Sequence, residues 1–137
     1  MVDALSIENK LRQALAKEPT VATAFLFGSL LTNRFGPESD VDLGLLFFPD
    51  EVPQALEVFE LKDRLSRALG CDVDAVVLNT ANPVIGMQVL RKGRKLLERD
   101  SRVSNEFFVR CVNLYADLKM VRAPNERQIL NGRIFAP

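Results

Sequence analysis

Short apolar runs and longer amphipathic stretches alternate along this chain. Residues 21–27 (VATAFLF) form a short continuous apolar run, which is typical of a buried strand. Residues 41–48 and 72–78 are the second and third expected strands, in which aspartates interrupt the apolar residues. A shorter run at residues 95–98 also has the composition of a strand. The expected sheet therefore has three strands, or four if this last run is one of them.

The amphipathic stretches predict helices at residues 3–17, 51–69 and 102–122, where apolar residues recur near helical spacing. A short helix is expected between the turn at residues 79–83 and about residue 91. The apolar face of the 51–69 helix is expected to be formed by Val52, Ala55, Leu56, Phe59, Leu65, Ala68 and Leu69. The apolar side of the last helix, which Pro124 is expected to end, is formed by Phe107, Phe108, Cys111, Leu114, Tyr115 and Leu118.

This order of elements predicts an α/β or α+β protein in which helices flank a small mixed sheet. The chain has 137 residues, of which 47% are hydrophobic and 26% charged, a profile typical of a soluble globular protein. No repeat or linker interrupts it. Residues 1–137 are therefore expected to form a single domain, with the 102–122 helix and the tail at 123–137 packed on it or on a partner.

Composition excludes several classes of protein. No apolar run reaches the roughly 18 residues that span a bilayer, and the N-terminus lacks the features of a signal peptide, so we expect a cytoplasmic protein that does not enter a membrane. Cys71 and Cys111 do not form a CxxC motif and are expected to be reduced thiols. Lys and Arg total 18, as do Asp and Glu, and this balance argues against direct nucleic-acid binding.

The chain contains no histidine. This absence excludes Ser-His-Asp and Cys-His nucleophilic sites and every zinc site that uses histidine. The candidates for proton and charge chemistry are therefore the carboxylates, the lysines, the single tyrosine, Tyr115, and bound metal ions.

Gly28 and Ser29 come directly after the first expected strand. Glycine lets the backbone turn tightly and approach a ligand, and a helix beginning at Ser29 would offer free N–H groups to a phosphate. An ordinary turn followed by a helix N-cap explains the same two residues, and taken alone they favour that explanation.

Two pairs of aspartates lie at the starts of expected strands. Asp40 and Asp42 are two residues apart, so on a strand their side chains share one face and repel each other unless a cation lies between them. Their oxygen ligands suit a divalent metal, magnesium in particular. Asp72 and Asp74 repeat this spacing, and periodicity cannot decide between them. A solvated strand edge is the alternative explanation for each pair.

A phosphate-holding turn, a same-face aspartate pair and a further aspartate on another strand together suit metal-assisted attack on a nucleotide phosphate. With these features the sequence resembles the minimal nucleotidyltransferases of the DNA polymerase β superfamily. The family's motif places Asp-x-Asp ten residues after Gly-Ser, as in Gly28-Ser29, residues 30–39 and Asp40-Val41-Asp42. The stretches "PESDVDLGLL", "VDAVVLNTANPVIGMQVLRKGRKLLERD" and "NEFFVRCVNLYADLK" extend the likeness, which is greatest to the MntA-like antitoxins encoded beside HEPN-domain toxins.

The resemblance implies a polymerase β-like fold and a role for each motif. Asp40 and Asp42 would bind magnesium, with two ions expected, and Asp74, which has the family's "VDxV" context, would complete the catalytic and metal site. Gly28 and Ser29 would hold the triphosphate of ATP.

The residues just after Gly28-Ser29 depart from the family pattern. Many relatives carry arginines just after Gly-Ser, whereas residues 30–33 here are Leu-Leu-Thr-Asn. Arg34 is the arginine that would contact the triphosphate instead.

The resemblance also implies a function, which is Mg-dependent transfer of AMP from ATP to a tyrosine hydroxyl of a partner HEPN-domain toxin. A non-catalytic antitoxin that acts by binding alone is one alternative, although such a protein has no need of three carboxylates. A nucleotidyltransferase for a small hydroxylated molecule is another, although 137 residues leave little room for a separate substrate domain.

Overall fold

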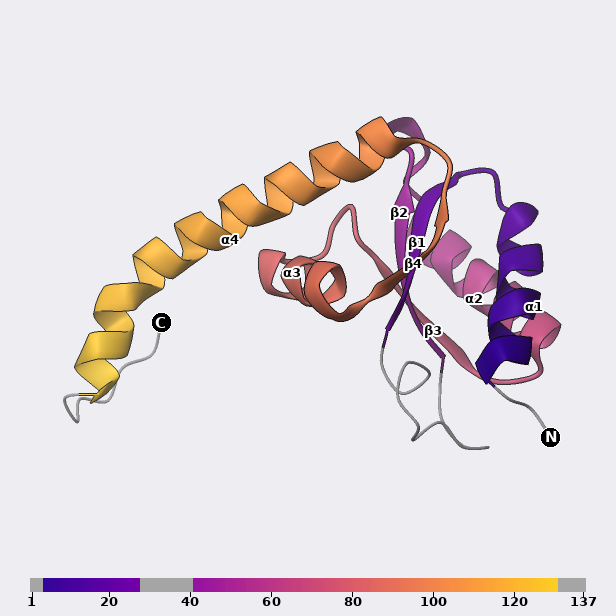
Figure 1. Ribbon diagram of the computed structural model, residues 1–137, viewed down its shortest axis with the longest axis horizontal. Coiled ribbons are helices and arrows are strands. Elements are labelled where there is room, and N and C mark those ends of the chain that lie inside the picture. The colour runs from indigo at the N-terminus through magenta and orange to yellow at the C-terminus, as the bar shows by residue number, and fades with distance from the viewer. Residues whose placement is uncertain (1–3, 28–40, 131–137) are drawn as a thin grey trace.

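A four-stranded sheet lies between two layers of helices (Figure 1). The computed structural model describes residues 4–27 and 41–130. In chain order its elements are α1 (Ala4–Ala16), β1 (Val21–Phe27), β2 (Val41–Phe47), the 3-10 turn η2 (Pro49–Glu51), α2 (Ala55–Leu69), β3 (Val73–Val77), α3 (Pro83–Lys92), β4 (Arg94–Glu98) and α4 (Ser101–Leu130).

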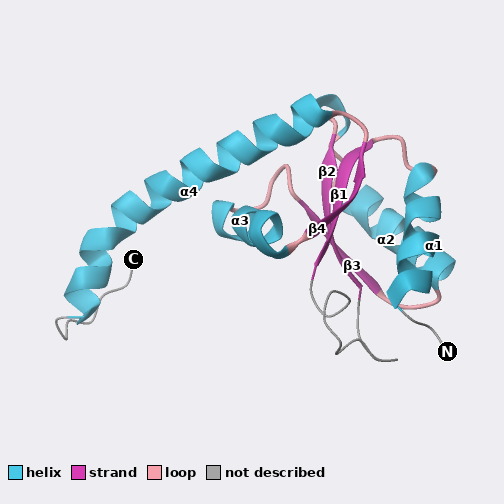
Figure 2. Ribbon diagram, in the orientation of Figure 1, coloured by secondary structure: helices cyan, strands magenta, loops and turns pink. Residues whose placement is uncertain are grey.

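The strands are ordered β3-β2-β1-β4, and Figure 2 shows them between the helices. β1 is antiparallel to both β2 and β4, whereas β2 and β3 are parallel. Two adjacent parallel strands need a crossover connection, which α2 provides. The sheet is therefore mixed and has four strands, which confirms the predicted fold class and makes the 95–98 run a strand.

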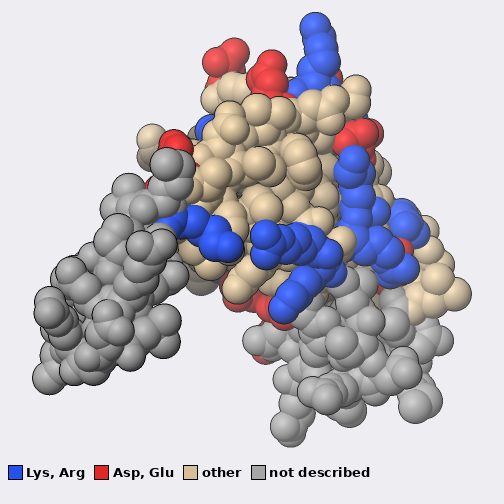
Figure 3. Space-filling view, turned by 60° about the vertical axis from the view of Figure 1, so that its left-hand side comes forward, with Lys and Arg blue, Asp and Glu red and all other residues tan. Residues whose placement is uncertain are grey.

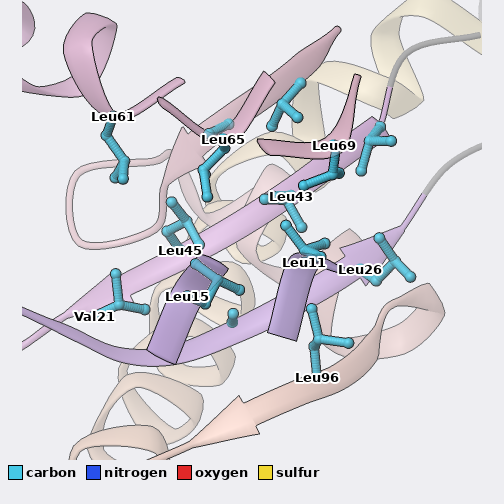
Figure 4. Packing of buried hydrophobic residues seen from close by; sticks show 14 of the residues in the cluster. Leu11, Leu15, Val21, Leu26, Leu43, Leu45, Leu61, Leu65, Leu69 and Leu96 are labelled. Atoms are coloured by element: carbon cyan, nitrogen blue, oxygen red, sulfur yellow. The ribbon is translucent and has the colours of Figure 1, made fainter. Parts of the chain in front are cut away.

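α1 and α2 cover one face of the sheet and form the larger hydrophobic cluster (Figure 4). Alternate residues of β2 and β3 enter this cluster, because successive side chains of a strand lie on opposite faces. Its buried members include Ile7, Leu11 and Leu15 of α1, Leu61, Leu65 and Leu69 of α2, and Leu26, Leu43 and Leu45 of the central strands.

α3 and the first turns of α4 cover the opposite face, around Phe25, Leu46, Leu78, Val89, Phe107 and Cys111. Two glycines make this layer thin. A Cβ added to Gly44 of β2 would lie 3.2 Å from Leu78 Cδ1, and one added to Gly86 of α3 would lie 2.7 Å from Cys111 Sγ. α3 therefore packs closely on the sheet and on α4 because side chains are missing at both points.

α2 differs from the prediction in where it begins and in which residues it buries. It starts at Ala55, not at residue 51, because Val52 is extended and the capping box of Gln54 and Glu57 marks the start of the helix. Its buried stripe is Leu61, Leu65 and Leu69. The predicted face was wrong at Leu56 and Phe59, which are 68% and 69% exposed, and at Ala55 and Ala68, which are also exposed. The reason is that only one narrow stripe of the helix faces the sheet.

α4 runs to Leu130 and passes through Pro124, so the predicted end of this helix was wrong. An interior proline removes one helical hydrogen bond and costs about 3 kcal/mol, but the bonds on either side of it persist. The predicted apolar side was also only partly right, since Phe108 is 50% exposed and Leu114 45% exposed. Figure 1 gives the reason, because α4 leaves the sheet and projects away from it. No helix among the described residues is long and apolar enough to cross a membrane.

Arg99, just after β4, closes the connection between α1 and β1. Its Nη1 donates to the carbonyl oxygens of Val21 (2.7 Å) and Glu18 (3.2 Å), and its Nη2 donates to those of Leu15 (3.0 Å) and Ala16 (3.4 Å). The last carbonyls of a helix have no partner within the helix. One guanidinium therefore satisfies the end of α1 and ties it to the sheet.

Candidate active site

Two of the predicted site residues face each other across neighbouring strands. In the parallel pairing of β2 and β3, Asp42 is the register partner of Asp74, and in the antiparallel pairing of β1 and β2, Phe27 is the partner of Asp42. Paired residues of adjacent strands share a face and lie about 5 Å apart. The register therefore sets Asp74, Asp42 and Phe27 in a row across three strands, at the end of the sheet where β1 finishes and β2 and β3 begin.

This row lies on the face that α3 covers, just beyond the covered part. Two residues further along β2, Gly44 lies beneath Leu78 and Val89, and Val76 of β3 packs against the same cluster. Asp42 itself is partly buried, and the side chain of Asp74 is 60% exposed. The two carboxylates thus stand where a packed layer gives way to solvent, which is a position open to a ligand.

Asp72 and Asp74 have different structural roles. Asp72 precedes β3, and its carbonyl oxygen accepts a hydrogen bond of 2.9 Å from the backbone N–H of Val41. Asp74 lies within β3 and is the residue in register with Asp42. The geometry thus favours Asp74, in agreement with the resemblance, where periodicity alone left both open.

Four predicted site residues lie outside the described residues, namely Gly28, Ser29, Arg34 and Asp40. The described strands nevertheless fix where their segment is attached. β1 ends at Phe27 and β2 begins at Val41, at the same end of the sheet as Asp42 and Asp74. The segment that joins these strands therefore starts and finishes beside the carboxylate pair.

Lys62 is a site neighbour that the sequence pattern did not reveal. Its Nζ lies 3.3 Å from Oδ1 of Asp74, although Lys62 belongs to α2, on the other face of the sheet. One turn later, Ser66 Oγ accepts a hydrogen bond of 3.0 Å from the backbone N–H of Val73. In sequence, Lys62 is one of several charged residues on an amphipathic helix, so no signal separated it from the others.

A basic segment lies at the same end of the sheet, beside β1. Arg91, Lys92, Arg94 and Lys95 are exposed at the junction of α3 and β4, and Figure 3 shows Lys and Arg side chains gathered on one face of the molecule. Arg94 is the register partner of Leu26, the residue before Phe27.

Three of these cations have partners within the chain. Arg94 forms an ion pair with Glu8 of α1, and the Arg91 guanidinium lies 5.3 Å from the centre of the Tyr115 ring. The Lys95 ammonium donates a hydrogen bond of 2.7 Å to Glu98 and lowers the pKa of that carboxyl. The first two contacts connect β4 to α1 and α3 to α4, and the third lies within β4, so these three cations have structural roles.

Comparison with known proteins places this arrangement in a family. A family model described as "Polymerase beta, Nucleotidyltransferase" matches residues 9–102, which include both described carboxylates and the segment between β1 and β2. The chain belongs to this nucleotidyltransferase family. Asp42 and Asp74 thus lie in a fold whose members act on nucleotides.

Individual proteins similar to this nucleotidyltransferase support the same family assignment. It is 30% identical over 118 residues to the protein adenylyltransferase MntA of Shewanella oneidensis, in an alignment that covers 84% of this chain and 81% of that protein. A crystal structure of a toxin–antitoxin with AMP-PNP matches with a TM-score of 0.76 and 27% identity, over 90% of this chain and 98% of that chain.

A third relative comes from a structure of tri-AMPylated Shewanella oneidensis HEPN toxin in complex with MNT antitoxin. It matches with a TM-score of 0.73 and 26% identity, and the match covers 93% of this chain and 98% of that chain. All three likenesses span most of both proteins, so the match includes α4 as well as the sheet.

The described part of the nucleotidyltransferase site fits a hard divalent cation. Asp42 and Asp74 supply carboxylate oxygens from adjacent strands, and such oxygens are the ligands that Mg²⁺ prefers. Among the described residues they form a pair, with no cluster of three or more acidic, cysteine or histidine side chains. Asp40, the third predicted ligand, directly precedes β2 and lies outside the described residues.

Proposed function

We propose that this protein is an antitoxin adenylyltransferase, which transfers AMP from ATP to a tyrosine hydroxyl of a partner HEPN-domain toxin. The observation that carries the proposal is the register of Asp42 with Asp74 on a nucleotidyltransferase sheet. The name of the Shewanella oneidensis relative, a protein adenylyltransferase, and the tri-AMPylated toxin in a matched structure indicate the group transferred and the acceptor. Because the reaction uses ATP and magnesium, we propose that it takes place in the cytoplasm.

Each site residue has a role in this proposal. Asp40, Asp42 and Asp74 would hold two Mg²⁺ ions, whose chemistry is to neutralise charge on the reacting phosphate oxygens. Gly28 and Ser29 would hold the outer phosphates through backbone N–H groups, with Arg34 beside them.

In the transfer step, the acceptor hydroxyl oxygen forms a bond to the α-phosphorus, and the bond from that phosphorus to pyrophosphate breaks. The carboxylate of Asp74 accepts the hydroxyl proton. Alignment of the acceptor with the α-phosphorus and preorganised charge supply most of the rate in such transfers. With no histidine in the chain, a phosphohistidine intermediate is excluded, and we propose that AMP passes directly to the acceptor.

Two other functions remain as alternatives that experiment can separate from this one. A binding antitoxin would silence the toxin without ATP. A nucleotidyltransferase for a small molecule would transfer AMP without any toxin. The paired carboxylates argue against the first, and the extent of the match to a protein adenylyltransferase argues against the second.

The decisive experiment uses ATP labelled at either the α or the γ phosphate. The protein is incubated with magnesium, the proposed partner HEPN-domain toxin and each labelled ATP in turn. We expect α label on a tyrosine of the toxin and release of pyrophosphate. No label is expected when magnesium is omitted or when Asp42→Asn replaces the native protein.

The other outcomes each contradict the proposal. Label from the γ position alone would make the protein a kinase. A silenced toxin without label from either position would establish the binding antitoxin, and AMP transfer only to a small hydroxylated molecule would establish the second alternative.

A further inference from the structure

Lys62 reaches the candidate active site around the edge of the sheet. α2 packs on the face of the sheet opposite to Asp74, through Leu61, Leu65 and Leu69. β3 is an edge strand of the sheet, so no further strand separates α2 from the face that carries Asp74. The long side chain of Lys62 spans this edge, and its Nζ lies 3.3 Å from Asp74 Oδ1.

The backbone of β3 is fixed to α2 next to this contact. The outward N–H of Val73 donates a 3.0 Å hydrogen bond to Ser66 Oγ, one helical turn after Lys62. Residues four apart lie on the same side of a helix, so Ser66 and Lys62 contact consecutive residues of the strand. The contact of Lys62 with Asp74 is therefore set by a docked helix and not by a loop.

The charges around Asp74 explain how the contact with Lys62 affects the orientation of the carboxylate. Asp42 stands in register beside Asp74, and two neighbouring carboxylates on one face repel each other. The side chain of Asp74 is 60% exposed, so packing alone does not hold its rotamer. A cation that engages Oδ1 from the outer edge restricts the carboxylate and leaves Oδ2 for the reacting groups.

We propose that Lys62 is a positioning residue, which holds the Asp74 carboxylate in the orientation that transfer requires. This inference rests on the proposed function, because it assigns a supporting residue to the same site. An ordinary exposed ion pair contributes little to stability, so the effect of Lys62 belongs to turnover and not to folding.

The test compares three variants in the labelled-ATP assay with the partner toxin. Lys62→Met keeps a long side chain but removes the charge, and Lys62→Arg keeps the charge. Arg67→Met is the matched control, because Arg67 lies on the same helix and pairs at 3.1 Å with Asp63, away from the site.

We expect Lys62→Met to lower kcat about 10- to 100-fold, the usual loss when the partner of an active-site ligand is removed, with KM for Mg-ATP within twofold of the native value. Lys62→Arg should recover most of the rate, and Arg67→Met should match the native protein. A kcat for Lys62→Met within twofold of the Arg67→Met control would overturn the proposal. A rise in KM that accounts for the whole loss would overturn it too, because Lys62 would then be a nucleotide ligand.

A second measurement does not depend on the reaction. In the NMR spectrum of the native protein, the Cε–Hε signal of Lys62 should shift on Asp74→Asn and stay in place on Asp72→Asn. Equal responses to the two substitutions would show that the ion pair does not form, and the proposal would fail even if transfer occurs. If the native protein transfers no AMP to any acceptor, the proposed function fails and this inference falls with it, whatever the NMR result.

Discussion

At the scale of single residues, the proposed function depends on which carboxylates of adjacent strands lie in register. Asp72 contributes its backbone carbonyl to the start of β2, while Asp74 presents its side chain beside Asp42. Both residues are exposed, so burial does not distinguish them. The register of the parallel strands does.

This difference predicts unequal effects of two isosteric substitutions. Asp74→Asn should lower the rate of AMP transfer about 10²- to 10⁴-fold, the usual contribution of a general base, because the amide cannot accept the proton. Asp72→Asn should stay near the native rate, since the backbone carbonyl that bonds to Val41 is retained. Single-turnover transfer to the toxin measures both, and circular dichroism checks that both variants fold. The reverse ranking would mean that the register of β3 is wrong by two residues.

At the scale of elements, α3 is held between the sheet and α4 by contacts that leave no room for a side chain. Gly86 meets Cys111 of α4, and Phe107 packs one turn earlier on that helix. Burial raises the pKa of the Cys111 thiol, which keeps it neutral in this contact. The position of α3 in turn determines how far this face of the sheet is covered, and the covered part ends beside Asp42.

Gly86→Ala should therefore destabilise the fold by about 1–3 kcal/mol, the usual cost of overpacking a core. The new Cβ would lie 2.7 Å from Cys111 Sγ, so α3 and α4 must separate or the thiol must rotate. Urea denaturation of Gly86→Ala, Cys111→Ala and the double variant forms a thermodynamic cycle. We expect the double variant to be more stable than the sum of the single effects, and strictly additive effects would contradict the assigned contact.

At the scale of the whole molecule, α4 has two parts: its first turns cover the sheet, and the rest of the helix projects away from it (Figure 1). Its first turns bury Phe107 and Cys111, and the next residues include the exposed apolar side chains Val112 and Leu114. Figure 1 shows that the helix then continues away from the sheet. Among the residues whose side chains are described, the last buried one is Cys111. Exposed apolar surface of this kind is typical of protein contact sites.

Replacement of Val112 and Leu114 by serine should consequently leave the domain folded and weaken its complex with the proposed partner toxin. We expect Tm to change by less than about 4 °C, which corresponds to roughly 1 kcal/mol for a domain of this size. Mg-ATP affinity, measured by calorimetry, should be unchanged, while the Kd for the toxin should rise. A large loss of Tm would instead show that these residues pack on the domain itself.

Much of this protein follows from local sequence. The continuous apolar run of β1 identifies it as a buried strand, because a strand buried on both faces needs apolar residues at every position, and its predicted bounds are the observed ones. Apolar-rich stretches also identify β2 and β3, whereas the short, mostly exposed β4 was left open. The spacing of Gly28-Ser29 and Asp40-Val41-Asp42, together with the segments that follow it, indicates the family, and the family match confirms it.

Tertiary structure decided what depends on neighbours distant in the sequence. Which stripe of α2 is buried was settled by its docking on the sheet, and α4 continues past Pro124 although local propensity predicts an end there. Periodicity left Asp72 and Asp74 open, since a period of two places both on one face, and only the VDxV context favoured Asp74. The pairing of β3 with β2 adds that Asp74 is the residue in register with Asp42. Lys62 required the edge of the sheet, because only a helix packed behind an edge strand can send a side chain around it to the opposite face.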